Sequence, residues 1–163
     1  GRRPIEQIWY TGKIMGETVA KTICGEKSSY EPGIFFNSAK FLDIEYQTYG
    51  NILAQPPEGA QSFFWQHPTE NLLVRINFDS ESKKVIGVNT FGIRMRHEVW
   101  DAWLKKEATI EEVLVDLATA NFDPEFFKRF EKDIVAKYNM EYQTNLTLKK
   151  NGIGAFLKNM LTH

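Results

Sequence analysis

Residues 71–92 read NLLVRINFDSESKKVIGVNTFG, and this stretch decides the predicted fold. Its first half places an apolar side chain at every second position, as a strand with one buried face does. These apolar members are Leu72, Val74, Ile76 and Phe78. Asp79–Lys83 is a polar turn, and Lys84–Phe91 is again rich in β-branched and aromatic residues. The stretch therefore predicts two antiparallel strands joined by a short turn.

Further runs of apolar and aromatic residues precede this pair. We expect strand structure over residues 41–49 in one run, over 52–54 and over 62–66. Gly50-Asn51 follows the first of these runs, and the turn sequence QPPEG follows the second. The runs together predict about five strands of an antiparallel meander, with one face buried and the other partly wet.

The hydrophobic period changes to that of a helix after Gly92. The first predicted helix covers Arg96–Lys105, and the second follows Thr109, which forms a capping-box pattern with Glu112. A third is expected to begin at Asp123-Pro124, an N-cap followed by a first-turn proline. Its inward side is expected to consist of Phe126, Phe127, Phe130, Ile134 and Tyr138. Because strands come first and helices afterwards, the predicted class is α+β, with about three helices after the sheet.

A separate helix is expected at the N-terminus, over residues 4–24. Pro4 suits a first turn, and Gly25 suits the position that follows a helix. Apolar residues recur near the helical period at Ile8, Ile14, Met15, Val19 and Ile23. On another face Gly12, Gly16 and Ala20 form a stripe of small residues that permits close approach of a backbone or a flat ligand. This helix is therefore expected to pack against another element.

The composition divides the chain into three parts. Residues 26–34 are polar and contain Pro32-Gly33, so they predict a loop after the N-terminal helix. Residues 1–26 are then one unit, residues 35–140 are the α+β domain, and residues 141–163 are a tail. The tail carries a short amphipathic pattern over 153–161, which is expected to dock on its own protein or to fray, with docking on a membrane or on a partner as the alternative.

Charge and cysteine content exclude several classes of protein. Twenty Lys and Arg against 21 Asp and Glu leave a net charge of -1, which argues against nucleic-acid binding through bulk electrostatics. The single cysteine, Cys24, cannot form an internal disulfide, so we expect a cytoplasmic protein in which Cys24 is a small core residue. No apolar run approaches the roughly 18 residues that predict a membrane span.

The sequence offers few candidates for catalysis. None of the three histidines, His67, His97 and His163, has a second His or Cys at metal-ligand spacing, so no metal site is expected. His67 stands beside Pro68 and near Glu70, but a loop histidine of this kind is usually only solvated. The charged residues of 94–98 could hold an anion or a carboxylate at a strand-to-helix junction, although surface ion pairs are the favoured interpretation. Glycine-rich phosphate loops and a serine nucleophile elbow are both missing.

The N-terminal helix resembles a helix of a known family. Residues 5–25, IEQIWYTGKIMGETVAKTICG, are similar to the helix that closes the FAD-binding domain of flavoprotein reductases with two dinucleotide-binding domains. The resemblance implies that Gln7, Ile8, Trp9, Tyr10 and Gly12 lie beside the flavin of the intact protein. The helix start would direct backbone N–H groups to the pyrimidine oxygens of the flavin, and Trp9 or Tyr10 could cover the ring.

The segment after this helix is similar to the C-terminal interface domain of the same family. The turn DSESKK at 79–84, the strand VIGVN at 85–89, Gly92 and the helix TIEEVLVDL at 109–117 carry the likeness, which covers residues 5–135. It implies a parent oxidoreductase that uses FAD and NAD(P)H, with its own FAD and NAD domains and a second subunit of a homodimer as partners. The aromatic residues Phe63, Phe64 and Trp65 are expected at such an interface.

One departure from the family indicates the branch. The disulfide-reductase branch ends with a His-Pro-Thr-x-x-Glu arrangement, whereas residues 120–126 read ANFDPEF and contain no histidine. The resemblance is therefore to ferredoxin-reductase-like or NADH-oxidase-like members. Because the sequence begins at Gly1 without a methionine, we expect a piece of a longer enzyme, inactive and free of FAD by itself. The alternative is a freestanding α+β module that binds a protein or an apolar ligand.

Overall fold

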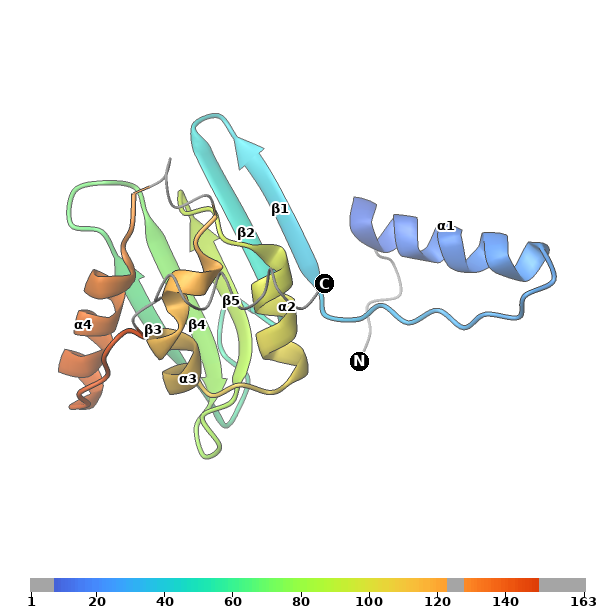
Figure 1. The fold of residues 1–163 in the computed structure, drawn as a ribbon. Coiled ribbons are helices and arrows are strands. Elements are labelled where there is room, and N and C mark those ends of the chain that lie inside the picture. The colour runs from blue at the N-terminus through green and yellow to red at the C-terminus, as the bar shows by residue number, and fades with distance from the viewer. Residues whose placement is uncertain (1–7, 123–127, 150–163) are drawn as a thin grey trace, which may run out of the picture.

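The computed structural model describes residues 8–122 and 128–149, and they form one N-terminal helix, a five-stranded sheet and further helices (Figure 1). The elements are α1 (Trp9–Ile23), β1 (Phe36–Phe41), β2 (Ile44–Gly50), β3 (Ala60–Gln66), β4 (Leu73–Asp79), β5 (Val85–Phe91), α2 (His97–Lys105), α3 (Ile110–Val115), the 3-10 helix η1 (Leu117–Ala120) and α4 (Glu131–Tyr142). The α+β class is confirmed. Among the described residues, no helix combines the length and the apolar character needed to cross a membrane.

The sheet has the strand order β1-β2-β5-β4-β3, and all neighbours are antiparallel. The predicted meander is correct for β3, β4 and β5, but β5 then pairs with β2. The single run predicted over 41–49 contains the last residue of β1 and most of β2, and the two strands meet at a turn formed by Leu42 and Asp43. No strand forms at 52–54; these residues belong to the connection from β2 to β3.

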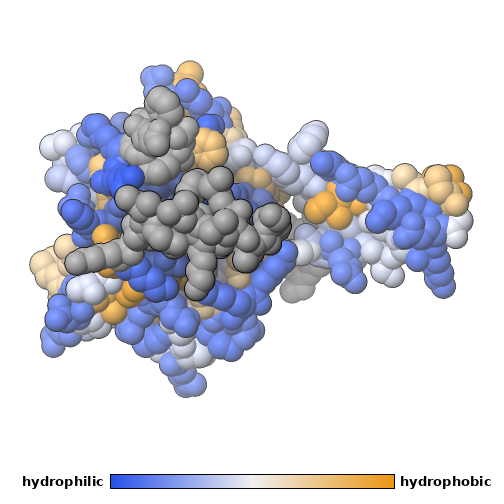
Figure 2. Space-filling model, in the orientation of Figure 1, coloured by the Kyte–Doolittle hydropathy of each residue, from blue (hydrophilic) through white to orange (hydrophobic). Residues whose placement is uncertain are grey.

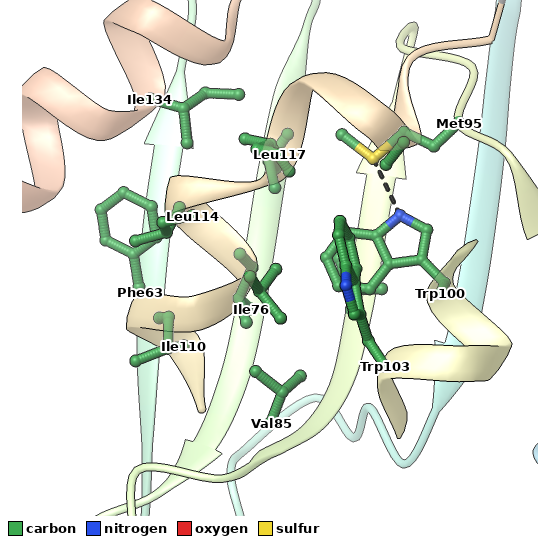
Figure 3. Close-up of a cluster of buried hydrophobic side chains, with 14 of the residues drawn as sticks. Phe63, Ile76, Val85, Met95, Trp100, Trp103, Ile110, Leu114, Leu117 and Ile134 are labelled. Atoms are coloured by element: carbon green, nitrogen blue, oxygen red, sulfur yellow. Dashed lines mark hydrogen bonds between the residues drawn. The ribbon is translucent and has the colours of Figure 1, made fainter. Parts of the chain in front are cut away.

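The hydrophobic core lies between one face of the sheet and the helices α2, α3 and α4 (Figures 1 and 3). Val74, Ile76 and Phe78 of β4 are fully buried, as their alternation predicts. The large side chains that meet them from the helices are Trp100, Trp103, Ile110, Leu114, Leu117 and Ile134. Trp100 Nε1 donates a hydrogen bond to Met95 Sδ at 3.0 Å within this core.

A buried amide joins the sheet to α2. Gln47 Oε1 accepts from the backbone N–H of Met95 at 2.6 Å, and Gln47 Nε2 donates to the Met95 carbonyl at 3.1 Å. The hydroxyl of Tyr49 donates to the same carbonyl at 3.4 Å. These bonds satisfy both backbone polar groups of the buried residue Met95, between β5 and α2, and so they hold the beginning of α2 over β2.

Two of the three predicted C-terminal helices have the expected starts. α2 covers His97–Lys105, and the capping box before α3 is present, with Glu112 N donating to Thr109 Oγ1 at 3.3 Å and Thr109 N to Glu112 Oε2 at 2.8 Å. α4 begins at Glu131, and residues 128–130 are not helical, so the helix does not run on from Asp123-Pro124. Ile134 and Tyr138 are buried as predicted, whereas Phe126 and Phe127 lie outside the described residues.

The N-terminal helix differs from its prediction at its start and in its packing. Ile8 is extended and α1 begins at Trp9, so the helix is not continuous from Pro4. Gly25 ends it with a φ of +95°, as the glycine predicts. α1 buries no residue, and Cys24 is exposed, which corrects the expectation of a core cysteine. The amphipathic pattern of 153–161 lies outside the described residues.

Residues 51–59, which we call the strap, connect β2 to β3. They cross the face of the sheet that lies opposite the helices α2, α3 and α4. We call this helix-free side the outer face. The strap backbone lies so close to Gly87 that a Cβ there would be 2.4 Å from the Asn51 carbonyl oxygen. Arg75 of β4 donates to the Ala54 carbonyl at 3.3 Å. Asn77, between Gly87 and Ser62 in the sheet register, is fully buried, and its side-chain amide has no hydrogen-bond partner among the described residues.

Candidate functional site

The start of α1 has backbone donors without a partner inside the helix. Its first helical bond runs from Gly12 N to Ile8 O at 3.0 Å, so the N–H groups before Gly12 have no partner within the helix. No side chain within residues 8–122 and 128–149 caps them, and the first turn contains no acidic residue. The partial positive charge of the helix N-terminus is therefore left unneutralised by the described residues of α1.

Aromatic contacts connect this helix start to the sheet. Trp9 is 71% exposed and meets Tyr10 edge-on at 5.2 Å between ring centroids. Tyr10 contacts Phe36 at the beginning of β1, at 4.7 Å. Phe36 in turn stacks on Tyr49 at 5.1 Å and contacts His97 of α2 at 4.1 Å. Four elements, α1, β1, β2 and α2, thus meet at one aromatic cluster.

The structure therefore brings together two groups of residues that the sequence singles out separately. The helix start at Ile8, Trp9 and Tyr10 and the junction at 94–98 are joined through Phe36. Gln7 lies outside the described residues. Phe36 and Tyr49 connect the two groups. Their role cannot be predicted from the sequence, because their contacts form only when β1 pairs with β2.

The charges of the 94–98 junction pair with each other and with β2. Arg94 Nε lies 2.8 Å from Glu45 Oε1, and Arg96 Nε lies 2.8 Å from Glu98 Oε1. The pKa of Glu98 is lowered, first by its own backbone N–H and then by Arg96. The favoured interpretation of surface ion pairs is therefore the observed one, and both guanidinium groups already have carboxylate partners.

The phenol of Tyr49, in the centre of the cluster, is not prepared for proton transfer near neutral pH. Burial raises the pKa of Tyr49 well above its ordinary value, and the charge of Glu98 raises it further, so the phenol stays protonated. Among the described residues no cluster of three or more His, Cys, Asp or Glu could hold a metal ion. Backbone donors and aromatic surfaces are what the described site offers to a ligand.

The predicted interface residues on β3 lie on two faces. Phe63 is fully buried and Trp65 is 5% exposed, whereas Phe64 is 44% exposed. Successive strand residues point to opposite sides of a sheet, so Phe63 and Trp65 enter the core of this chain beneath α4. This corrects the expectation of one surface formed by all three. Only Phe64 is left as an interface candidate.

His67 has a structural role in the turn between β3 and β4. Its Nδ1 accepts hydrogen bonds from the backbone N–H of Thr69 at 3.3 Å and of Glu70 at 3.1 Å. Its ring also contacts Trp65 at 6.0 Å and Phe130 at 5.5 Å. The carboxylate of Glu70 pairs with Lys128, which lowers its pKa, so Glu70 does not orient the imidazole as a catalytic base.

No family model and no curated protein matches the chain, but solved structures do. One, described as an NAD-dependent persulfide reductase from A. fulgidus, aligns over 77% of this chain and 26% of its own, with a TM-score of 0.53 and 16% identity. An engineered water-forming NADPH oxidase, bound to NADPH, aligns over 66% and 27%, with a TM-score of 0.48 and 15% identity. The chain thus spans about a quarter of the length of either structure.

The first of these similarities shows a shared fold. The α+β arrangement of this chain also occurs within a protein that is named as an NAD-dependent persulfide reductase.

Proposed function

We propose that this chain is the C-terminal part of an oxidoreductase that uses FAD and NAD(P)H, in which α1 closes the FAD domain and residues 35–140 form the interface domain. The observation that carries the proposal is the state of α1. A 15-residue helix with no buried side chain and an uncapped start is joined to a sheet domain whose fold also occurs in an NAD-dependent enzyme. A helix of this length needs packing that the described chain does not supply.

The residues of α1 fit a flavin. The free N–H groups before Gly12 would hold the pyrimidine oxygens, and Ile8, Trp9 and Tyr10 would lie nearest to the ring. Space is open beside the small residues as well, since an added Cβ at Gly12 or Gly16 would meet nothing within 4 Å. When bound, FAD would supply the hydride and electron transfer. The aromatic cluster of Tyr10 and Phe36 would keep the helix start against the interface domain.

The proposal is tested on the intact protein. An open reading frame upstream of Gly1 that encodes glycine-rich dinucleotide loops is expected, whereas a nearby start codon would favour the freestanding module. In the intact protein, Trp9→Ala and Gly12→Leu are expected to lower flavin content or to shift the flavin reduction potential. Met140→Gln, an exposed change on α4, serves as the matched control and leaves both unchanged. Flavin content and potential that stay unchanged in both α1 variants would refute the role of α1.

A further inference from the structure

The strap lies on the outer face without burying any of its own residues. The helices cover the sheet on the side that Figures 1 and 2 show, so the strap is on the far side of the sheet. Ile52 and Pro56 are half-buried, the other strap residues are exposed, and Leu53 is 47% exposed. Because burial of apolar surface is the main force that holds a segment in place, the strap is attached weakly.

Hydrogen bonds fix the two ends of the strap more firmly than its middle. At the start, Asn51 N donates to the backbone of β5 at 2.7 Å, and at the end Gly59 O accepts from the turn between β4 and β5 at 2.8 Å. For residues 52–56, the bond from Arg75 Nη1 to Ala54 O, at 3.3 Å, is the one hydrogen bond to the sheet in the part of the chain that the structure describes. The middle of the strap therefore depends on one side chain of β4.

Glycines with positive φ stand at both ends of the strap. Gly50 has a φ of +67° and Gly59 a φ of +80°. Glycine adopts this region with little strain and has more accessible conformations than other residues. Hinges of moving segments are a few loop or element-terminal positions of this kind. The strap is thus a weakly attached segment between two positions at which the chain can change direction.

Asn77, beneath the strap, gives a second and independent observation. Its side chain is fully buried, yet neither Oδ1 nor Nδ2 has a hydrogen-bond partner among the described residues. In the register it lies between Gly87, which the strap backbone approaches, and Ser62, whose hydroxyl accepts from Arg75 Nε at 2.9 Å. An unpaired buried amide costs free energy, and opening of the strap would let water bond to both polar atoms. The residue that the strap covers therefore opposes closure.

We propose that the strap is a lid on the outer face, which opens about Gly50 and Gly59 while the sheet stays folded. Opening breaks the bond between Arg75 and Ala54 and exposes the amide of Asn77 to water, so a loss and a gain oppose each other. The outer face then has a closed form, in which Asn77 is inaccessible, and an open form, in which Asn77 and the guanidinium of Arg75 can be reached from solvent. The inference requires neither a flavin nor further domains, so it can fail without the proposed function failing.

Thiol labelling on the two faces of β4 tests the proposal in the 163-residue chain. In a Cys24→Ser background, Asn77→Cys places a thiol under the strap, and Ile76→Cys places one in the core beneath the helices (Figure 3). Each rate of labelling by dithionitrobenzoate is compared with the rate that urea unfolding of the same variant allows. We expect the thiol at position 77 to react at least about tenfold faster than global unfolding allows, with little dependence on low urea concentrations. The thiol at position 76 is expected to follow global unfolding.

The wild-type chain is measured as well, because Asn77→Cys removes the amide that opposes closure. Exchange of the side-chain N–H groups of Asn77 with solvent, followed by NMR, is expected to be faster than global unfolding allows. Protection of both the thiol at position 77 and this amide to the level of global unfolding would show that the strap stays closed, and would overturn the proposal.

Arg75→Met tests whether the strap is the part that moves. It removes the bond to Ala54 and is expected to speed labelling at position 77 about fivefold relative to global unfolding. Lys105→Met, which removes a cation from its pair with Asp101 on the helix side, is the matched control and leaves that rate unchanged. An unchanged rate in Arg75→Met would contradict the role of the strap.

Backbone amide exchange distinguishes the strap from the edge strand beside it. β3 is an edge strand next to β4, and its fraying would also expose position 77. We expect the amides of β3 that pair with β4 to stay protected while the thiol at position 77 reacts. Exchange of these amides as fast as the labelling would assign the exposure to β3, and the lid would be refuted.

Discussion

Asn77 and Asn89 lie on neighbouring strands of the outer face and have opposite hydrogen-bonding states. Asn89 Nδ2 donates to the Gln47 carbonyl and to Thr48 Oγ1, both at 2.9 Å. Asn77 is fully buried, and neither polar atom of its side chain has a partner among the described residues. A buried amide without partners costs free energy on folding, whereas a bonded one contributes to stability.

Replacement of each residue by leucine, which is similar in size, is therefore expected to change stability in opposite directions. Asn77→Leu should raise the free energy of unfolding by about 1 kcal/mol, because it removes an unpaired buried amide. Asn89→Leu should lower it by about 1 kcal/mol, because it removes two hydrogen bonds. Urea unfolding measures both. A loss of stability in Asn77→Leu equal to that in Asn89→Leu would show that the Asn77 amide is satisfied in solution.

The sequence predicts the burial of single residues well where apolar and polar residues alternate regularly. It predicts burial poorly where the element that carries the residue packs against nothing in the described chain. Ile76 and Phe78 are buried as predicted, because their strand lies inside the sheet. Cys24 is exposed because α1 as a whole buries nothing. Phe64 differs from Phe63 and Trp65 only in strand parity, which a three-residue aromatic run does not reveal.

Two glycines differ in the space around them: Gly87 of β5 has backbone atoms close by, whereas Gly16 of α1 has none within 4 Å. A Cβ at Gly87 of β5 would lie 2.4 Å from Asn51 O and 2.6 Å from Asn51 C, both backbone atoms of the strap. Gly87→Ala must therefore displace the strap or bend β5, and we expect it to lower the free energy of unfolding by about 2–3 kcal/mol. Thermal and urea unfolding measure the loss.

The matched control is Gly16→Ala in α1, where an added Cβ meets nothing within 4 Å. It should stabilise the helix by about 0.5–1 kcal/mol through helix propensity, visible as slower amide exchange within α1 and not in the sheet. Equal effects of the two substitutions on global unfolding would contradict the contact between strap and strand.

Element boundaries show where local signals suffice. The capping box at Thr109 and the glycine at Gly25 are local chemistry, and both mark helix ends as predicted. The turn between β1 and β2 cannot be recognised in this way, because Leu42 occupies a position with positive φ that normally holds Gly or Asn. The strap cannot be predicted either, because residues 52–54 have the composition of a strand but lie in the connection from β2 to β3.

At the scale of the whole molecule, buried tyrosines should make stability depend on alkaline pH. Burial raises the pKa of Tyr138 to about 12 from its ordinary value of 10. A group whose pKa rises on folding contributes its full stability below the pKa of the unfolded chain and loses it as the pH rises toward the folded value. The free energy of unfolding is therefore expected to fall between about pH 10 and 12, by up to about 1.4 kcal/mol per pH unit from this group.

Tyr138→Phe keeps the ring contacts with Phe63 and Tyr142 and removes the titrating hydroxyl. Urea unfolding of this variant is expected to show a shallower decline over the same pH interval. Some decline should persist, because burial also raises the pKa of Tyr49 and of Tyr142. Identical slopes in the variant and the wild type would show that Tyr138 ionises equally in the folded and unfolded chain.

The class of the fold is predictable from the order of periodicities, strands before helices, whereas the arrangement of the sheet is not. Pairing of β5 with β2 joins residues about 40 positions apart, and no local pattern encodes it. The aromatic cluster at α1 has the same origin, because it requires Tyr10, Phe36 and His97 to meet. The sequence thus predicts the helix of the candidate site. It does not predict which side chains of the sheet and of α2 lie around the start of that helix.

The position of β5 also has a consequence for how the chain folds. β1 with β2 and β3 with β4 are local hairpins that can form early, yet each leaves an open edge until β5 enters between β2 and β4. On a ribosome, the sheet cannot close before residue 91 has emerged. β5 is the last strand to be synthesised and forms a local hairpin with β4, so we expect its long-range pairing with β2 to be slower than the pairing of any of the local hairpins.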